Sequence, residues 1–176
     1  MFNYQSKEFF INMKPSDIPP KGHTDRGDFI RREKEKCRLG VNIGGIWIPG
    51  GLYYHLNYHK LLVDVGKDEV GKTISVISNP DFRDNDWVIH TEYAQAVKEQ
   101  KGYCLASARQ VGKTSCLVSL CARELFLVKD SNALVVFGGT EDKQSFTTKL
   151  QTAIEYGEPF IVVPNIDKDW DKTEIR

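Results

Sequence analysis

The fold expected for this chain follows mainly from SARQVGKT, at residues 107–114. A short apolar segment (103–106) precedes it, and a segment that is apolar almost all round (114–128) follows it. When a strand runs through a loop into a helix, the free N–H groups of the first helical turn surround an anion. The pattern therefore predicts a phosphate-binding loop, in which Ser107 stands where the usual motif has its first glycine.

Several loop residues have an expected role of their own. Gly112 lets the backbone approach the phosphates, Lys113 reaches the β- and γ-phosphates, and the Thr114 hydroxyl binds Mg²⁺. Arg109 either stabilises charge on the γ-phosphoryl group in the transition state or points outward to a surface carboxylate. Arg109 and Lys113 are the catalytic candidates. The expected nucleotide-binding residues are Ser107, Ala108, Arg109, Gln110, Val111, Gly112, Lys113 and Thr114.

A second stretch, GKDEVGKT at residues 66–73, matches the motif G-x-x-x-x-G-K-[ST] without a departure. It is nevertheless predicted to be a charged hairpin loop, because the following residues, 74–78, are rich in β-branched side chains and lead to Pro80, which is typical of a strand. Asp68 and Glu69 also place negative charge where a phosphate would bind.

The alternation of helix and strand around residues 107–114 predicts the fold class. Helices are expected from Asp84 or Asn85 to Gly102, over 114–128, and from Thr140 to Gly157, with strands at 103–106 and 133–137. The run ALVVF at 133–137 suits a parallel strand that is covered on both faces. This order predicts an α/β fold of the P-loop NTPase type, with a mostly parallel sheet that is incomplete at the C-terminus.

Two parts are expected along the chain. Residues 1–80 would form a small α+β segment, with a charged helix over 25–38 and strands at 60–65 and 74–78. Residues 81–176 would form the beginning of an ATPase core, truncated before the acidic strand end that holds Mg²⁺.

Composition and charge limit the functions to consider. The charges of the 24 basic and 24 acidic residues cancel. This balance excludes an overall positive potential that would attract nucleic acid. No apolar run approaches the roughly 18 residues of a membrane span, and the N-terminus lacks the apolar core of a signal peptide. The four cysteines form no C-x-x-C pair, which fits a reduced compartment. His55 and His59 are four residues apart, but no third ligand follows from their spacing, so they are predicted to belong to an aromatic cluster.

The loop with its internal arginine resembles the deviant Walker A loop of the large terminase subunit of tailed bacteriophages. The stretch DFRDNDW (81–87) resembles the segment that leads into that family's ATPase core, and GGLYYHLNY (50–58) resembles an aromatic motif of some phage terminases. The resemblance makes Arg109 the cis-acting arginine, Lys113 the phosphate lysine and Thr114 the magnesium ligand. It aligns Asp86 with the glutamine that reads adenine in many members.

The same resemblance implies an ATP-driven motor that moves double-stranded DNA into the capsid, with ATP and Mg²⁺ as cofactors. Its implied partners are phage DNA, the portal protein and the small terminase subunit, in a homo-oligomeric ring in the host cytoplasm and away from membranes. A nuclease domain is expected downstream of Arg176.

The residues that would complete an ATPase are not recognisable in the sequence. The run 133–137 ends in two glycines, and Asp167 follows a segment that is interrupted by Pro164. The full-length protein is therefore expected to be an ATPase, and residues 1–176 alone to be inactive. Two alternatives stay open: another P-loop ATPase of the helicase kind, and a non-hydrolysing nucleotide-binding or assembly module.

Overall fold

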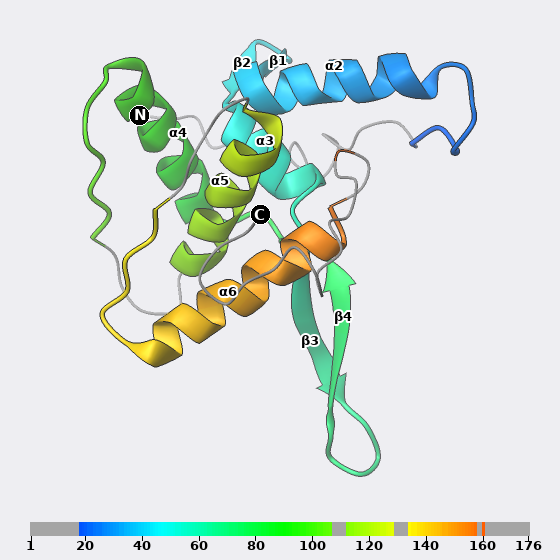
Figure 1. Cartoon of the computed structure of the whole chain (residues 1–176), viewed down its shortest axis with the longest axis vertical. Coiled ribbons are helices and arrows are strands. Elements are labelled where there is room, and N and C mark those ends of the chain that lie inside the picture. Colours follow the sequence, from blue (N-terminus) through cyan, green and yellow to red (C-terminus); the bar gives the residue numbers. More distant parts are fainter. Residues whose placement is uncertain (1–17, 107–111, 129–133, 158–159, 161–176) are drawn as a thin grey trace.

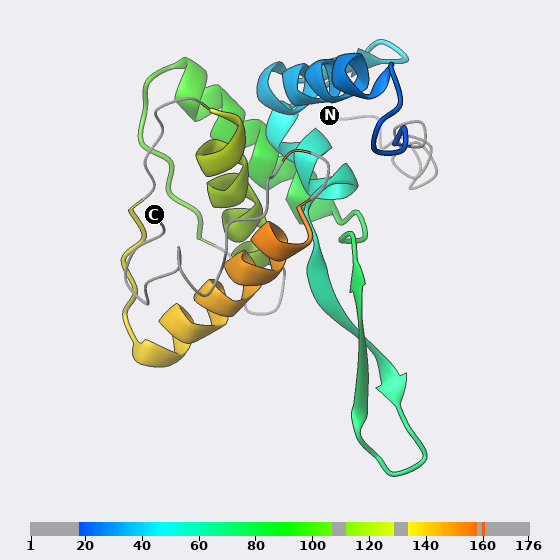
Figure 2. The same cartoon turned by 45° about the vertical axis from the view of Figure 1, so that its right-hand side comes forward.

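The computed structural model describes residues 18–106, 112–128, 134–157 and 160. The helices α2–α6 form one body, and the hairpin of β3 and β4 projects from it (Figures 1 and 2). The elements in chain order are α2 (Arg26–Leu39), β1 (Val41–Ile43), β2 (Ile46–Ile48), α3 (Gly50–Asn57), β3 (Leu61–Lys67), β4 (Thr73–Ser78), α4 (Asp84–Lys98), α5 (Lys113–Leu127) and α6 (Thr140–Glu155).

The helices predicted from the sequence are confirmed with small shifts of their ends. Helix α2 ends at Gly40, whose φ of +86° favours glycine. Helix α4 stops at Lys98, before the expected Gly102. Helix α6 begins at Thr140, as expected, with Gly139 as its N-cap, and it ends at Glu155, before the expected Gly157. The sequence analysis did not predict the β1–β2 hairpin or α3.

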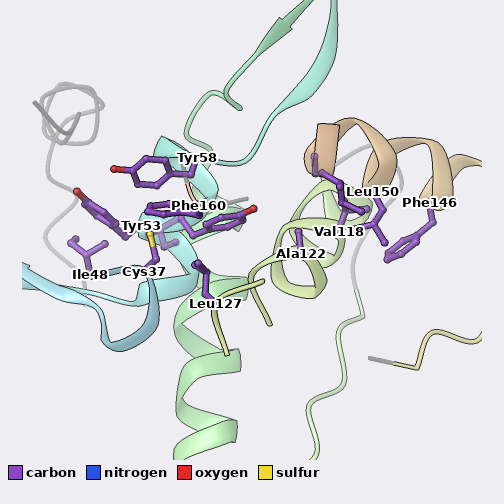
Figure 3. Close-up of a cluster of buried hydrophobic side chains, with 14 residues drawn as sticks. Cys37, Ile48, Tyr53, Tyr58, Val118, Ala122, Leu127, Phe146, Leu150 and Phe160 are labelled. Carbon is purple, nitrogen blue, oxygen red and sulfur yellow. The ribbon is translucent and has the colours of Figure 1, made fainter. Parts of the chain in front are cut away.

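The buried core contains a mainly aromatic group, with Ile48, Cys37 and Leu127 beside its tyrosines, and a mainly aliphatic group that also holds Phe146 (Figure 3). In the aromatic group, Tyr58 and Phe160 meet edge to face, with ring centroids 4.4 Å apart. The aliphatic group, which includes Val118 and Leu150, fills the space between α5 and α6. Each large buried side chain contributes roughly 1.5–3 kcal/mol before ordering costs. The core joins side chains from both sides of residue 80, and the division of the chain at that point stays a prediction.

The stretch 66–73 forms the end of the β3–β4 hairpin, as predicted. The strands pair antiparallel from Leu61↔Ser78 to Lys67↔Thr73. At the tip, the Asp68 carboxylate accepts hydrogen bonds from the backbone N–H groups of Val70 (3.0 Å) and Lys72 (2.8 Å). The carboxylate of Asp68 thus already accepts hydrogen bonds from the backbone N–H groups that a phosphate would need. This exact match to the motif is therefore not a phosphate site.

The predicted parallel sheet is wrong. The described residues are mixed α/β, with five helices and two small antiparallel sheets, β1–β2 and β3–β4. Neither 103–106 nor 134–137 pairs as a strand within the described part of the chain. Leu134 is 91% exposed and Val136 is 84% exposed, whereas Val135 and Phe137 pack against the core. A parallel strand has to be covered on both faces, and here only the face toward α6 is covered, so the apolar run does not behave as one.

Candidate functional site

Helix α5 begins directly after the predicted phosphate loop, but the strand expected before that loop, residues 103–106, does not pair within the described part of the chain. Gly112 is its N-cap with a φ of +86°, a left-handed conformation that favours glycine. Within the described residues no side chain caps this helix, and its first turn contains no acidic residue. The partial positive charge of the helix start is therefore not met by a carboxylate of the helix itself.

The predicted loop residues are only partly placed. Ser107, Ala108, Arg109, Gln110 and Val111 lie outside the described residues, and their expected roles stay predictions.

The first turn of α5 presents three polar side chains in sequence. Lys113 is half-buried, Thr114 is exposed, and Ser115 lines a cavity. The Ser115 hydroxyl is buried and has no hydrogen-bond partner among the described residues. The sequence analysis missed Ser115 because the motif ends at Thr114.

The start of α4 touches the start of α5. Asp86 accepts a hydrogen bond from the Arg83 backbone N–H (2.8 Å) and another from the Cys116 thiol (3.2 Å). A Cβ atom on Gly112 would lie 3.3 Å from a terminal guanidinium nitrogen of Arg83 and 3.9 Å from an Asp86 carboxylate oxygen. The residue that the resemblance aligned with adenine recognition, Asp86, is thus beside the predicted phosphate loop.

The electrostatics of Asp86 reflect its burial. Burial raises the pKa of this carboxyl, and the hydrogen bonds from Cys116 and Arg83 only partly offset that rise. An ionised Asp86 is therefore poorly stabilised where it sits.

A cavity of about 830 Å³ lies between the base of the hairpin, α6 and the starts of α4 and α5. Its volume is within the range of small-molecule sites, roughly 300–1,000 Å³. Arg83 and Lys149 bring positive charge to its wall. Four carboxylates oppose them there: Asp64, Asp81, Asp86 and Glu141. A polyphosphate in this cavity would need a cation between itself and the carboxylates.

Three histidines pack behind the start of α5. The ring centroids of His55 and His59 are 5.4 Å apart, and those of His55 and His90 are 5.0 Å apart. Burial lowers the pKa of all three, to about 4 for His59 and about 3 for His90. The imidazoles are therefore neutral at pH 7.

One donor atom from each of His55, His90 and Cys116 lies within 4.8 Å of the other two. The spacing of His55 and His59 in the sequence indicates no third ligand. The structure joins His55 instead to His90 on α4 and to Cys116 on α5. Residues that far apart leave no local spacing signal, so the sequence could not indicate this group.

Comparison with models of protein families, with curated proteins and with solved structures found no match for this chain. The resemblance to phage terminases stays a prediction. None of the helices in the described residues has both the length and the apolar character that a membrane span requires.

Proposed function

We propose that this chain binds the phosphates of Mg-ATP at the start of α5, as the ATP-binding part of a phage DNA-packaging terminase. The observation that carries the proposal is the start of α5, opened by a left-handed Gly112, which lines a cavity of about 830 Å³ beside Arg83. The phosphate-binding part of the proposal rests on this local arrangement alone; the parallel sheet that was expected with it is absent from the described residues.

The charges at this end of the helix suit an anion. The start of α5 carries a partial positive charge of roughly half an elementary charge. The Arg83 guanidinium is next to Gly112, and Lys113 is the first residue of the helix. An arginine and a lysine beside the backbone amides of a helix start, which no side chain of the described residues caps, are groups that bind phosphate.

The acidic side of the cavity supports binding of ATP as its magnesium complex. Asp81 and Glu141 line the same cavity as Gly112. A divalent cation between these carboxylates and the phosphates would remove the repulsion between them. We therefore expect ATP affinity to fall when Mg²⁺ is withheld.

The role in DNA packaging is supported by the sequence resemblance of residues 107–114, 81–87 and 50–58. Double-stranded DNA, the portal protein and the small terminase subunit are its proposed partners, and ATP hydrolysis is proposed for the full-length protein. For residues 1–176 alone we expect binding without turnover above background.

The test compares two lysines that each follow a glycine with positive φ and precede a threonine, Lys113 and Lys72. Lys113→Ala should weaken Mg-ATP binding at least about tenfold in isothermal titration calorimetry, because the phosphates lose a charge-assisted hydrogen bond. Lys72→Ala should leave the affinity within about twofold, because Lys72 is at the tip of the hairpin. Equal affinities in the two variants, or no ATP binding by the unmodified chain, would contradict the proposal.

A further inference from the structure

A group of buried nitrogen, sulfur and oxygen donors lies where three helices meet, behind the start of α5. His55 comes from α3, Asp86 and His90 come from α4, and Cys116 comes from α5. All four residues are at most 2% exposed. We propose that His55, His90, Cys116 and Asp86 bind one Zn²⁺ ion that links these three helices.

The two histidines carry buried ring nitrogens that the protein leaves unpaired. Within the described residues, Nδ1 of His55 and both ring nitrogens of His90 have no hydrogen-bond partner. A buried polar atom without a partner costs roughly 1–3 kcal/mol, so native structures seldom leave several together. A bound metal ion would give a lone pair of each imidazole a partner.

The geometry is close to that of a tetrahedral site. The donor atoms of His55, His90 and Cys116 already lie within 4.8 Å of one another. With metal–nitrogen bonds of about 2.0–2.1 Å and a metal–sulfur bond of about 2.3 Å, donors of a tetrahedral zinc site lie roughly 3.3–3.8 Å apart. Closing the site around an ion therefore requires the three donors to move toward one another.

Asp86 is placed to supply the fourth ligand. One of its oxygens accepts the hydrogen bond from the Cys116 thiol at 3.2 Å, and the other is 4.0 Å from Nε2 of His55. When the thiol loses its proton to bind metal, the first oxygen loses its hydrogen-bond donor and becomes available to the same ion. The carboxylate thus hydrogen-bonds one of the other three proposed ligands and lies 4.0 Å from a second.

The charges and the donor types select the ion. One thiolate, one carboxylate and two neutral imidazoles carry a charge of −2, which a divalent cation cancels in a buried setting. Mixed nitrogen and sulfur donors in a four-coordinate site favour Zn²⁺ over Mg²⁺ or Ca²⁺, which prefer oxygen ligands. Four protein ligands leave no open position, so the geometry points to a structural site.

The site would fix the end of α5 that faces the cavity. Cys116 lies in the first turns of this helix, and its backbone N–H donates to the carbonyl of Gly112 (3.1 Å). A metal ion on Cys116 would therefore hold Gly112 in place relative to Asp86 on α4 and His55 on α3.

The test uses Co²⁺ as a spectroscopic substitute for Zn²⁺ in the 176-residue chain after chelator treatment. The unmodified chain should bind one equivalent and show the visible bands of tetrahedral Co²⁺ with thiolate-to-metal charge transfer. Cys116→Ser should abolish the charge-transfer band, and both Cys116→Ser and His90→Gln should weaken Co²⁺ binding at least about 100-fold.

Two matched variants serve as controls. Cys121→Ser changes the other cysteine of α5, and His59→Gln changes the buried histidine that stacks on His55 but is outside the donor group. Both should keep the cobalt spectrum and an affinity within about threefold of the original. A charge-transfer band that survives Cys116→Ser, or one that disappears in either control, would overturn the proposed ligand set.

A second measurement avoids the risk that a ligand variant fails to fold. X-ray absorption of the zinc-loaded unmodified chain should show one sulfur and three nitrogen or oxygen neighbours around the metal. Only nitrogen and oxygen neighbours, or no retained zinc in the presence of a weak competing chelator, would refute the site.

Discussion

Two buried carboxylates, Glu33 on α2 and Asp86 on α4, are in opposite situations. Glu33 accepts hydrogen bonds from the hydroxyls of Tyr53 and Tyr58, each at 2.7 Å, and from the Lys36 ammonium at 2.5 Å. Burial alone would raise the pKa of Glu33, but these three donors together hold it below its ordinary value.

The surroundings of Asp86 leave it less stabilised. Among the described residues its hydrogen-bond partners are a thiol, which is a weak donor, and one backbone amide, and burial keeps its pKa raised. Ring nitrogens of His55 and His90 that have no partner in the described part of the chain lie close by. The difference separates two situations of buried polar groups: Glu33 is satisfied by hydrogen bonds within the fold, whereas the surroundings of Asp86 are where we propose that a metal ion binds.

The largest expected effect is a loss of folding stability. We expect it for a substitution of Glu33 and not for a substitution of Asp86. Glu33→Ala removes one partner of a buried charged network and should lower the free energy of unfolding by about 3–5 kcal/mol. Asp86→Asn in the metal-stripped chain should change it by less than about 1 kcal/mol, because the amide can keep the hydrogen bond from Arg83. Urea unfolding of the three proteins under one buffer condition measures both differences.

An Asp86→Asn variant that loses as much stability as Glu33→Ala would break the comparison. Asp86 would then be as fully engaged by the fold as Glu33, and the argument for a ligand around it would lose its basis.

The difference between the two regions also marks what could be predicted from the sequence. Helices α2, α4, α5 and α6 and the β3–β4 hairpin follow from periodicity and turn residues, which are local properties. The hairpin assignment of residues 66–73 succeeded because a β-branched run after Thr73 cannot open a helix.

The failures concern contacts between distant residues. A parallel sheet requires pairing that no local pattern specifies, and the run at 133–137 has the composition of a buried strand without the partners within the described residues. The group of His55, His90 and Cys116 spans three helices, and the Glu33 network joins α2 to residues 20 and 25 positions later. The Gly112 start of α5 was predictable because its chemistry lies in consecutive residues.

A smaller effect is expected from the tyrosines of the Glu33 network. Tyr53→Phe and Tyr58→Phe keep each ring but remove one donor to a buried charge, and each should cost about 1.5–3 kcal/mol. Because both hydroxyls donate to the same carboxylate oxygen, the double variant should differ from the sum of the two single variants.

Tyr54 provides the matched control. Tyr54 is on α3, like Tyr53. Its hydroxyl is buried but has no hydrogen-bond partner among the described residues. Tyr54→Phe should therefore leave thermal stability unchanged or raise it slightly. A loss for Tyr54→Phe equal to that for Tyr53→Phe would show that the network around Glu33 adds nothing beyond ring packing.

The smallest expected effect is a dependence on pH, and its sign follows from the direction of the Glu33 shift. The pKa of Glu33 is lowered in the folded chain from an ordinary value of 4.5. The ionised form is thus stabilised by folding, and this contribution is fully present above pH 4.5 and is lost as the pH falls through the folded-state pKa. The stability advantage of the unmodified chain over Glu33→Gln should therefore be constant near neutral pH and should shrink below pH 4.5, by at most about 1.4 kcal/mol per pH unit.

Urea unfolding of both proteins at a series of pH values from 7 to 3.5 measures this difference in stability directly. Comparing the two chains cancels the contribution of every other titrating group that they share. A difference that stays constant down to pH 3.5, or grows, would mean that the charge of Glu33 contributes nothing to the stability of this region.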